Sequence, residues 1–136
     1  ACGLAVIRYF ESHGVLDNVR ERGAELELRL RAIAERYPVA GSLRGRGLLY
    51  CLDFVDPATG GPLPADQPVG TAVQQAARRR GLLVRASPHN ATLAPPLVLT
   101  AADVTEIADI FEESVAEANE QVVSGGGVNL DVAFGL

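Results

Sequence analysis

The chain contains no lysine, although 12 of its 136 residues are arginines, and it contains no methionine. Without lysine it has no primary side-chain amine, so its side chains cannot form an imine with a carbonyl cofactor. Without methionine, Ala1 is not a translation start, and we expect the chain to be a piece of a longer one. These absences limit the chemistry before any motif is considered.

Cysteines, basic patches and long apolar runs are also scarce. Cys2 and Cys51 are too few for a disulfide framework and lie in no CxxC or Cys/His cluster, so we expect a reduced, cytoplasmic setting. The net charge is −5 and the arginines are dispersed among acids, which excludes nucleic acid as an expected partner. No apolar run approaches the ~20 residues of a membrane span, and no signal peptide is visible.

The remaining composition is that of a folded domain. Hydrophobic residues make up 48% of the chain and charged residues 21%, and the length suits one domain. We expect that domain to cover residues 1–123. Residues 124–136 begin with a glycine-rich stretch and predict a flexible tail.

Apolar residues at helical spacing predict helices over residues 2–13, 17–36, 69–80 and 100 to about 123. Gly14 and Gly81 follow two of them as helix stops, and Thr100 with Asp103 has the spacing of a capping box. Two of the helices carry apolar stripes that should face a core, namely Val19, Gly23, Leu26, Leu30 and Ile33, and Val104, Ile107, Phe111 and Val115.

Strand-like segments lie between these helices. Residues 48–55 are apolar on nearly both faces and predict a central strand, while residues 42–47, interrupted by glycine, predict an edge or bulge. Residues 82–87 and 91–94 predict a hairpin around a Pro-His-Asn turn. The expected fold is α+β, a small mixed or antiparallel sheet of about three to four strands covered by amphipathic helices, with a long N-terminal helix pair.

Three stretches, in this order and spacing, resemble the C-terminal small domain of class III aminotransferases, of the pyruvate-using ω-transaminase type. They are RGRGLL at residues 44–49, GLLVR at 81–85 and APPLVLT at 94–100, within a resemblance over residues 4–122. These fold-type I enzymes use pyridoxal phosphate. The resemblance implies a parent enzyme that moves an amino group from an amine or ω-amino acid to a keto acid.

The resemblance also implies what this chain lacks. The cofactor-binding lysine would lie upstream of Ala1, in the rest of the parent chain. This piece would then supply no catalytic residue, form part of the substrate pocket and be inactive alone. The parent is expected to be a homodimer.

Arg85 is the candidate substrate-binding residue. A strand over residues 82–87 would place Arg85 on the same face as Leu83 and Ser87. A guanidinium binds a carboxylate through two parallel hydrogen bonds and keeps its charge at any working pH. The resemblance implies that Arg85 binds the substrate carboxylate and swings away from donors that lack one. Some relatives carry an arginine at the position of Thr92. Because this chain has threonine there, Arg85 becomes the stronger candidate for binding the substrate carboxylate.

Each candidate has a structural alternative. Arg85 could pair with a neighbouring acid or lie over the sheet edge, and the arginines around Gly45 favour a strand-entry bulge with solvated side chains over an anion-facing turn. The arginine run at 78–80 is typical of a solvated helix C-terminus. We expect Asp53 to be a hydrogen-bonded structural carboxylate, or one on the solvent-facing side of the sheet, rather than a catalytic acid.

The two histidines are far apart, without acids or cysteines at ligand spacing, so we expect no metal site.

Two other functions stay open at this point. The chain could instead be a stand-alone interaction module with residues 19–33 as its interface. It could also be a small regulatory domain that binds amino acids.

Overall fold

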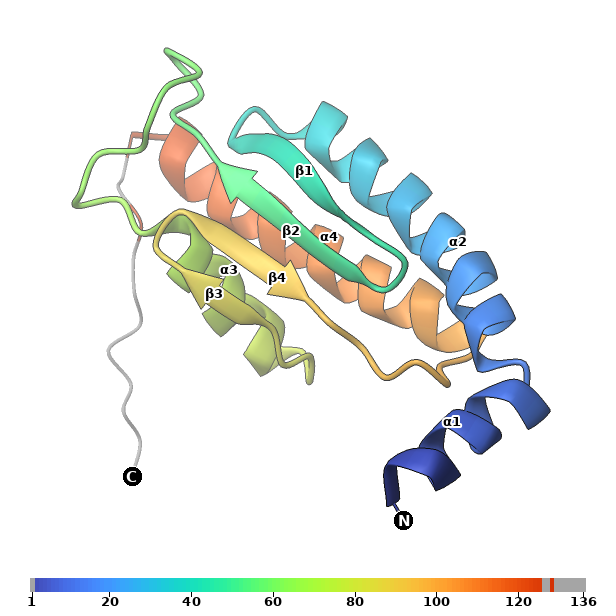
Figure 1. Cartoon of the computed structure of the whole chain (residues 1–136). Coiled ribbons are helices and arrows are strands. Elements are labelled where there is room, and N and C mark those ends of the chain that lie inside the picture. The colour runs from blue at the N-terminus through green and yellow to red at the C-terminus, as the bar shows by residue number, and fades with distance from the viewer. Residues whose placement is uncertain (1, 126–127, 129–136) are drawn as a thin grey trace.

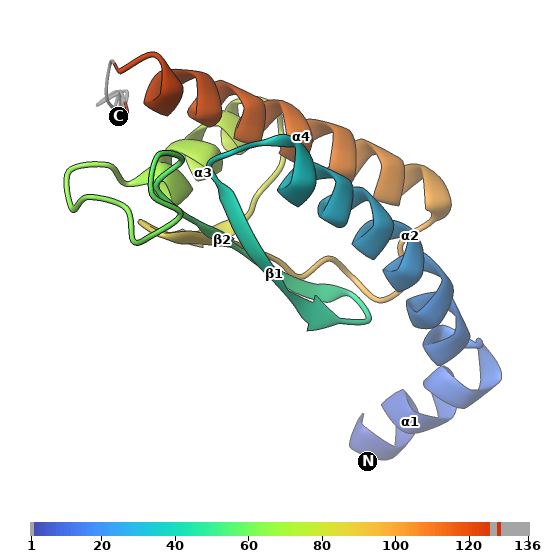
Figure 2. The same cartoon turned by 90° about the horizontal axis from the view of Figure 1, so that it is seen from above.

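The computed structural model describes residues 2–125 and 128, which form four helices and a four-stranded sheet. In chain order the elements are α1 (Cys2–Ser12), α2 (Val15–Arg36), β1 (Ala40–Arg46), β2 (Leu49–Phe54), α3 (Val69–Arg79), β3 (Arg85–Ser87), β4 (Asn90–Leu93) and α4 (Ala101–Val123). Helices α2, α3 and α4 lie on one side of the sheet, and α1 extends away from both layers (Figures 1 and 2). The predicted α+β class is confirmed.

The sheet has the order β1-β2-β4-β3, and each neighbouring pair is antiparallel. Strand β2 pairs on both sides, which confirms the central strand predicted over residues 48–55. Of residues 42–47, predicted as an edge or bulge, all but Gly47 belong to a full edge strand of seven residues, with an irregular register between Ala40 and Leu43. Gly45 is required in this hairpin, because a Cβ there would stand 2.1 Å from the carbonyl oxygen of Leu49.

Strand β3 is shorter than the predicted strand over residues 82–87. Only Arg85–Ser87 pair with β4. The backbone N–H of Leu82 donates to the carbonyl of Ala77, 2.9 Å away, and so closes the end of α3 instead of joining the sheet. The predicted alternation of faces nevertheless holds, since Leu83 is 82% exposed and Val84 only 8%.

One apolar core fills the space between the sheet and its covering helices. Strands β2 and β4 contribute every second residue, and the predicted stripes of α2 and α4 meet them there. The buried residues include Tyr50, Leu52, Phe54, Ala91, Leu93, Leu26, Leu30, Ile33, Val104, Phe111 and Val115, with Val19 and Ile107 partly buried against them. This one-sided burial leaves the opposite face of the sheet without a helix cover (Figure 2).

The entry to α4 is fixed by the predicted capping box. The backbone N–H of Asp103 donates to Thr100 Oγ1 at 3.2 Å, and the N–H of Thr100 donates to Asp103 Oδ2 at 2.6 Å. The Asn18 side chain donates to the carbonyls of Leu97 and Leu99, at 2.9 and 3.1 Å, and so ties the start of α2 to the same loop.

The two ends of the chain differ from this packed body. Helix α1 buries none of its residues, and Gly14, with φ 60°, separates it from α2. The tail predicted over residues 124–136 lies mostly outside the described residues, although Val128 packs partly against the core. Among the helices described, none is long and apolar enough to cross a membrane.

Candidate functional site

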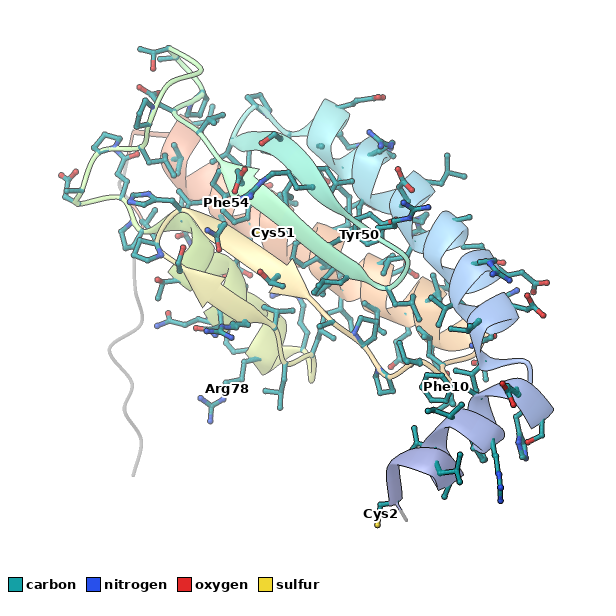
Figure 3. All side chains as sticks on the ribbon, viewed as in Figure 1. Cys2, Phe10, Tyr50, Cys51, Phe54 and Arg78 are labelled. Carbon is teal, nitrogen blue, oxygen red and sulfur yellow. The ribbon has the colours of Figure 1, made fainter. Side chains whose placement is uncertain are left out.

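The face of the sheet that points away from the helices carries short polar and charged side chains in register. Successive residues of a strand point to opposite faces, and Tyr50, Leu52 and Phe54 of β2 point into the core. Their neighbours on β2, and the residues paired with them, therefore form the other surface. We call this surface the open face and define it by Ser42, Arg44, Arg46, Leu49, Cys51, Asp53, Arg85, Ser87, Asn90 and Thr92. Figure 1 looks onto it, and Figure 3 shows Cys51 near its middle.

One row of the open face runs across all four strands. Arg44 pairs with Cys51, Cys51 with Thr92, and Thr92 with Arg85. Two guanidinium groups therefore stand on the two edge strands of the sheet. The residues between them, Cys51 and Thr92, are short and uncharged.

Arg85 is exposed on edge strand β3. Within the part of the chain that the structure describes, its side chain makes no hydrogen bond or ion pair. The arrangement favours an arginine available to an outside anion over one paired with a neighbouring acid. A free guanidinium can bind a carboxylate through two parallel hydrogen bonds.

Arg44, by contrast, is paired with an acidic side chain. Its Nε donates to Asp53 Oδ2 at 2.9 Å and its Nη2 donates to Asp53 Oδ1 at 2.6 Å, a two-pronged ion pair. Ser42 Oγ donates to the same carboxylate at 2.8 Å. The hydrogen bond from Arg44, followed by that from Ser42, lowers the pKa of Asp53 below its usual value. The hydrogen bonds predicted for the Asp53 carboxylate are confirmed, and Asp53 also lies on the solvent-facing side of the sheet.

The arginines around Gly45 thus have different environments. The favoured interpretation, a bulge with solvated arginines, agrees with the irregular register of β1 and with the exposure of both side chains, and Arg44, 63% exposed, is in addition held across the hairpin by Asp53. Arg46, two residues further along β1, is exposed and has no ion pair among the described residues. Because Arg44 is paired with Asp53, the hairpin does not form an anion-facing turn that uses both Arg44 and Arg46.

Most other arginines of the chain are paired on the helix side. Arginines of α2 and α3 reach acids of α4, such as Arg29 to Asp109, Arg36 to Glu112 and Arg79 to Glu117. Arg80 follows the same pattern, at 3.1 Å from Glu113 and 2.9 Å from Glu117. Of the run at 78–80, predicted as a solvated helix end, only Arg78 is without such a contact among the described residues. It points away from the body (Figure 3).

A hollow lies between α2 and the β1–β2 hairpin, and two of its polar lining residues, Glu27 and Tyr50, are bonded to each other. It measures about 580 Å³ and includes Gly23, Glu27 and Tyr50 in its lining. The Tyr50 hydroxyl donates to Glu27 Oε2 at 2.9 Å, and Arg31 donates to Glu27 Oε1. Burial, followed by the contact with Glu27, raises the pKa of Tyr50 to about 12. The network joins α2 to the sheet.

No side chain of this chain can form an imine with a carbonyl cofactor. Such a cofactor is bound as an imine by a lysine, and the sequence has none. The described residues also contain no group of three or more His, Cys, Asp or Glu side chains placed to hold a metal ion. The chemistry that the geometry supports is the binding of a small anion at Arg85.

The comparison with protein-family models matches residues 1–115 to the family described as Aminotransferase class-III. Among curated relatives, the diaminobutyrate–2-oxoglutarate transaminase of Halomonas elongata is 34% identical over 131 residues. These cover 94% of this chain and 28% of the relative. The acetylornithine aminotransferase of a Nostoc species is 38% identical over 121 residues, which cover 85% of this chain and 26% of the relative. The chain thus spans little more than a quarter of the length of these relatives.

Two solved structures share the fold of most of this chain. An ω-transferase from Vibrio fluvialis superposes with a TM-score of 0.81 at 30% identity, covering 89% of this chain and 29% of that one. A PMP-bound aminotransferase from Vibrio fluvialis superposes with a TM-score of 0.80 at 31% identity, covering 88% of this chain and 26% of that one. The fold of the 136 residues is therefore shared with a part of these larger chains.

Proposed function

The chain belongs to the class III aminotransferase family, and we propose that it is the C-terminal small domain of a pyridoxal-phosphate enzyme of the ω-transaminase type. The complete enzyme would move an amino group from an amine or ω-amino acid to a keto acid. Because the chain covers 28% of its relative from Halomonas elongata, the rest of the parent chain would hold the cofactor and its lysine. We also propose that the parent is a cytoplasmic homodimer.

The part proposed for this chain is one wall of the substrate pocket, with Arg85 as the group that binds the substrate carboxylate. One observation carries the proposal, namely that Arg85 stands exposed on the open face without an acidic partner among the described residues. Arginine is the side chain best suited to a carboxylate, since it offers two parallel, charge-assisted hydrogen bonds and stays charged. Without a lysine, the chain would be inactive by itself.

The test is Arg85→Ala in the complete enzyme, with keto acids and with an amine donor that has no carboxylate. Losing a charge-assisted hydrogen-bond pair should lower kcat/KM for keto acids by roughly 10- to 100-fold. The half-reaction with the carboxylate-free amine should change much less. Arg85→Lys should recover only part of the loss, because an ammonium cannot bind both carboxylate oxygens in the same planar fork.

Arg78→Ala is the matched control, since Arg78 is also an exposed arginine without an ion pair among the described residues, but it lies at the end of α3. It should leave the kinetics with keto acids unaltered. If Arg85→Ala behaves like Arg78→Ala with every substrate, Arg85 does not bind the substrate carboxylate.

A further inference from the structure

We propose that Arg44 is a positioning residue for Arg85. By holding the carboxylate of Asp53, it keeps the one acidic side chain of the open face from pairing with Arg85. The inference rests on the proposed function, in which Arg85 binds a substrate carboxylate. It adds a role for Arg44 and Asp53, which touch no substrate in this scheme.

The distances on the sheet make the competing pair possible. Asp53 pairs with Asn90 in the row next to that of Arg85, and β4 lies between their strands. Two strand spacings and one two-residue step give a Cα–Cα distance of about 12 Å. An extended arginine and an aspartate can bridge that distance and meet at hydrogen-bonding range.

The side chains between Asp53 and Arg85 would not prevent their meeting. Cys51, Thr92 and Asn90 occupy the intervening positions, and all three are short and uncharged. Asp53 therefore needs another cation if it is to stay away from Arg85. Arg44 is that cation, and with Ser42 it already satisfies both carboxylate oxygens.

Loss of Arg44 would leave an ionised and poorly satisfied carboxylate on the open face. Ser42 alone supplies one hydrogen bond to Oδ2, so Oδ1 would have no donor from the present set. The nearest guanidinium that the open face leaves unpaired is then that of Arg85. Because Asp53 and a keto-acid substrate both present a carboxylate, they would compete for the same guanidinium.

The experiment compares Arg44→Leu with Arg46→Leu in the complete enzyme. The two arginines are exposed on the same strand, and only Arg44 has an acidic partner among the described residues. Arg44→Leu should raise KM for a keto acid about threefold with little change in kcat, the effect expected of one exposed competing ion pair. Arg46→Leu should leave KM unaltered.

The double variant Arg44→Leu/Asp53→Asn separates competition from a general structural effect. Removing the carboxylate should return KM to within about twofold of its original value, since no acid would remain to compete. The single variant Arg44→Lys should keep KM near its original value, because the lysine ammonium can still pair with Asp53. Binding of acetate, measured by calorimetry, should weaken in Arg44→Leu and recover in the double variant, which gives a readout independent of turnover.

The two proposals fail in different ways. If Arg85→Ala leaves keto-acid kinetics unchanged, the proposed function falls and this inference falls with it. If Arg85→Ala is defective but Arg44→Leu matches Arg46→Leu, Arg44 does not position Arg85. The same conclusion follows if Arg44→Leu raises KM and Asp53→Asn does not reverse it.

Discussion

The two faces of strand β2 have opposite surroundings, although they alternate residue by residue along one short segment. On the covered face, Leu52 is 2% exposed and packs beneath the helices. On the open face, Cys51 and Asp53 are half-buried and Leu49 is 57% exposed. The covered face contributes the apolar burial that stabilises the domain, and the open face presents the charged groups that can meet a ligand.

The largest expected effect comes from a pair of substitutions at adjacent residues that face opposite ways. Leu52→Ala removes a fully packed side chain and should lower the free energy of unfolding by about 2–5 kcal/mol. Cys51→Ala removes one sulfur from the open face and should lower it by less than about 1 kcal/mol. Urea titration of both variants measures the difference. Equal losses would mean that the open face is as tightly packed as the core.

A second pair of substitutions tests how the helices on the covered face support the β3–β4 hairpin, which carries Arg85. Gly70 of α3 lies beneath the β3–β4 turn, where an added Cβ would stand 2.1 Å from the carbonyl oxygen of Ser87. Gly70→Ala should therefore destabilise the chain by about 1–3 kcal/mol, since backbone must move to admit the methyl group.

The control for this pair is Gly3→Ala. Gly3 lies in α1, and a Cβ there would meet nothing within 4 Å. Alanine favours helix over glycine, so this variant should be neutral or slightly more stable in the same urea titration. If both alanines behave alike, the turn and α3 do not pack as closely as their backbone atoms indicate.

Much of the covered face was predictable because burial imposes a period on the sequence. The α2 stripe from Val19 to Ile33 and the α4 stripe through Phe111 fall where the helical spacing predicts them. The capping box at Thr100 was equally readable, since it depends on residues three apart. The shortening of β3 was not, because it follows from a backbone bond between Leu82 and Ala77 that no side-chain pattern encodes.

The open face was harder to predict because its pairings cross strands. Arg44 and Arg46 look equivalent in sequence, and only the hairpin register decides which of them meets Asp53. The irregular register between Ala40 and Leu43 also brings Ser42 to the same carboxylate, and glycine-rich residues do not reveal where such an irregularity falls. Arg85 could be chosen from its residue type and from the resemblance, while its lack of an acidic neighbour required the structure.

The smallest expected effect is an acid-dependent loss of stability that belongs to the open face. The pKa of Asp53 is lowered in the folded chain from its ordinary 3.8, chiefly by Arg44. A lowered pKa means that the ionised form stabilises the fold above about pH 4 and that this contribution disappears as the pH falls through the folded value. Because the Arg44 side chain is largely solvent-exposed, we expect this contribution to be small.

Asp53→Asn should remove the acid-dependent stability that comes from Asp53 and leave the contributions of the other carboxylates unchanged. Glu27 and Asp103 also have lowered pKa values, so the original chain and the variant both lose stability in acid. Between pH 6 and pH 3 the variant should lose less, and Arg44→Leu should show the same reduced loss because it breaks the same pair. Urea titrations at the two pH values measure each loss. Identical losses in all three proteins would mean that the Arg44–Asp53 pair is too weakly held to keep Asp53 away from Arg85.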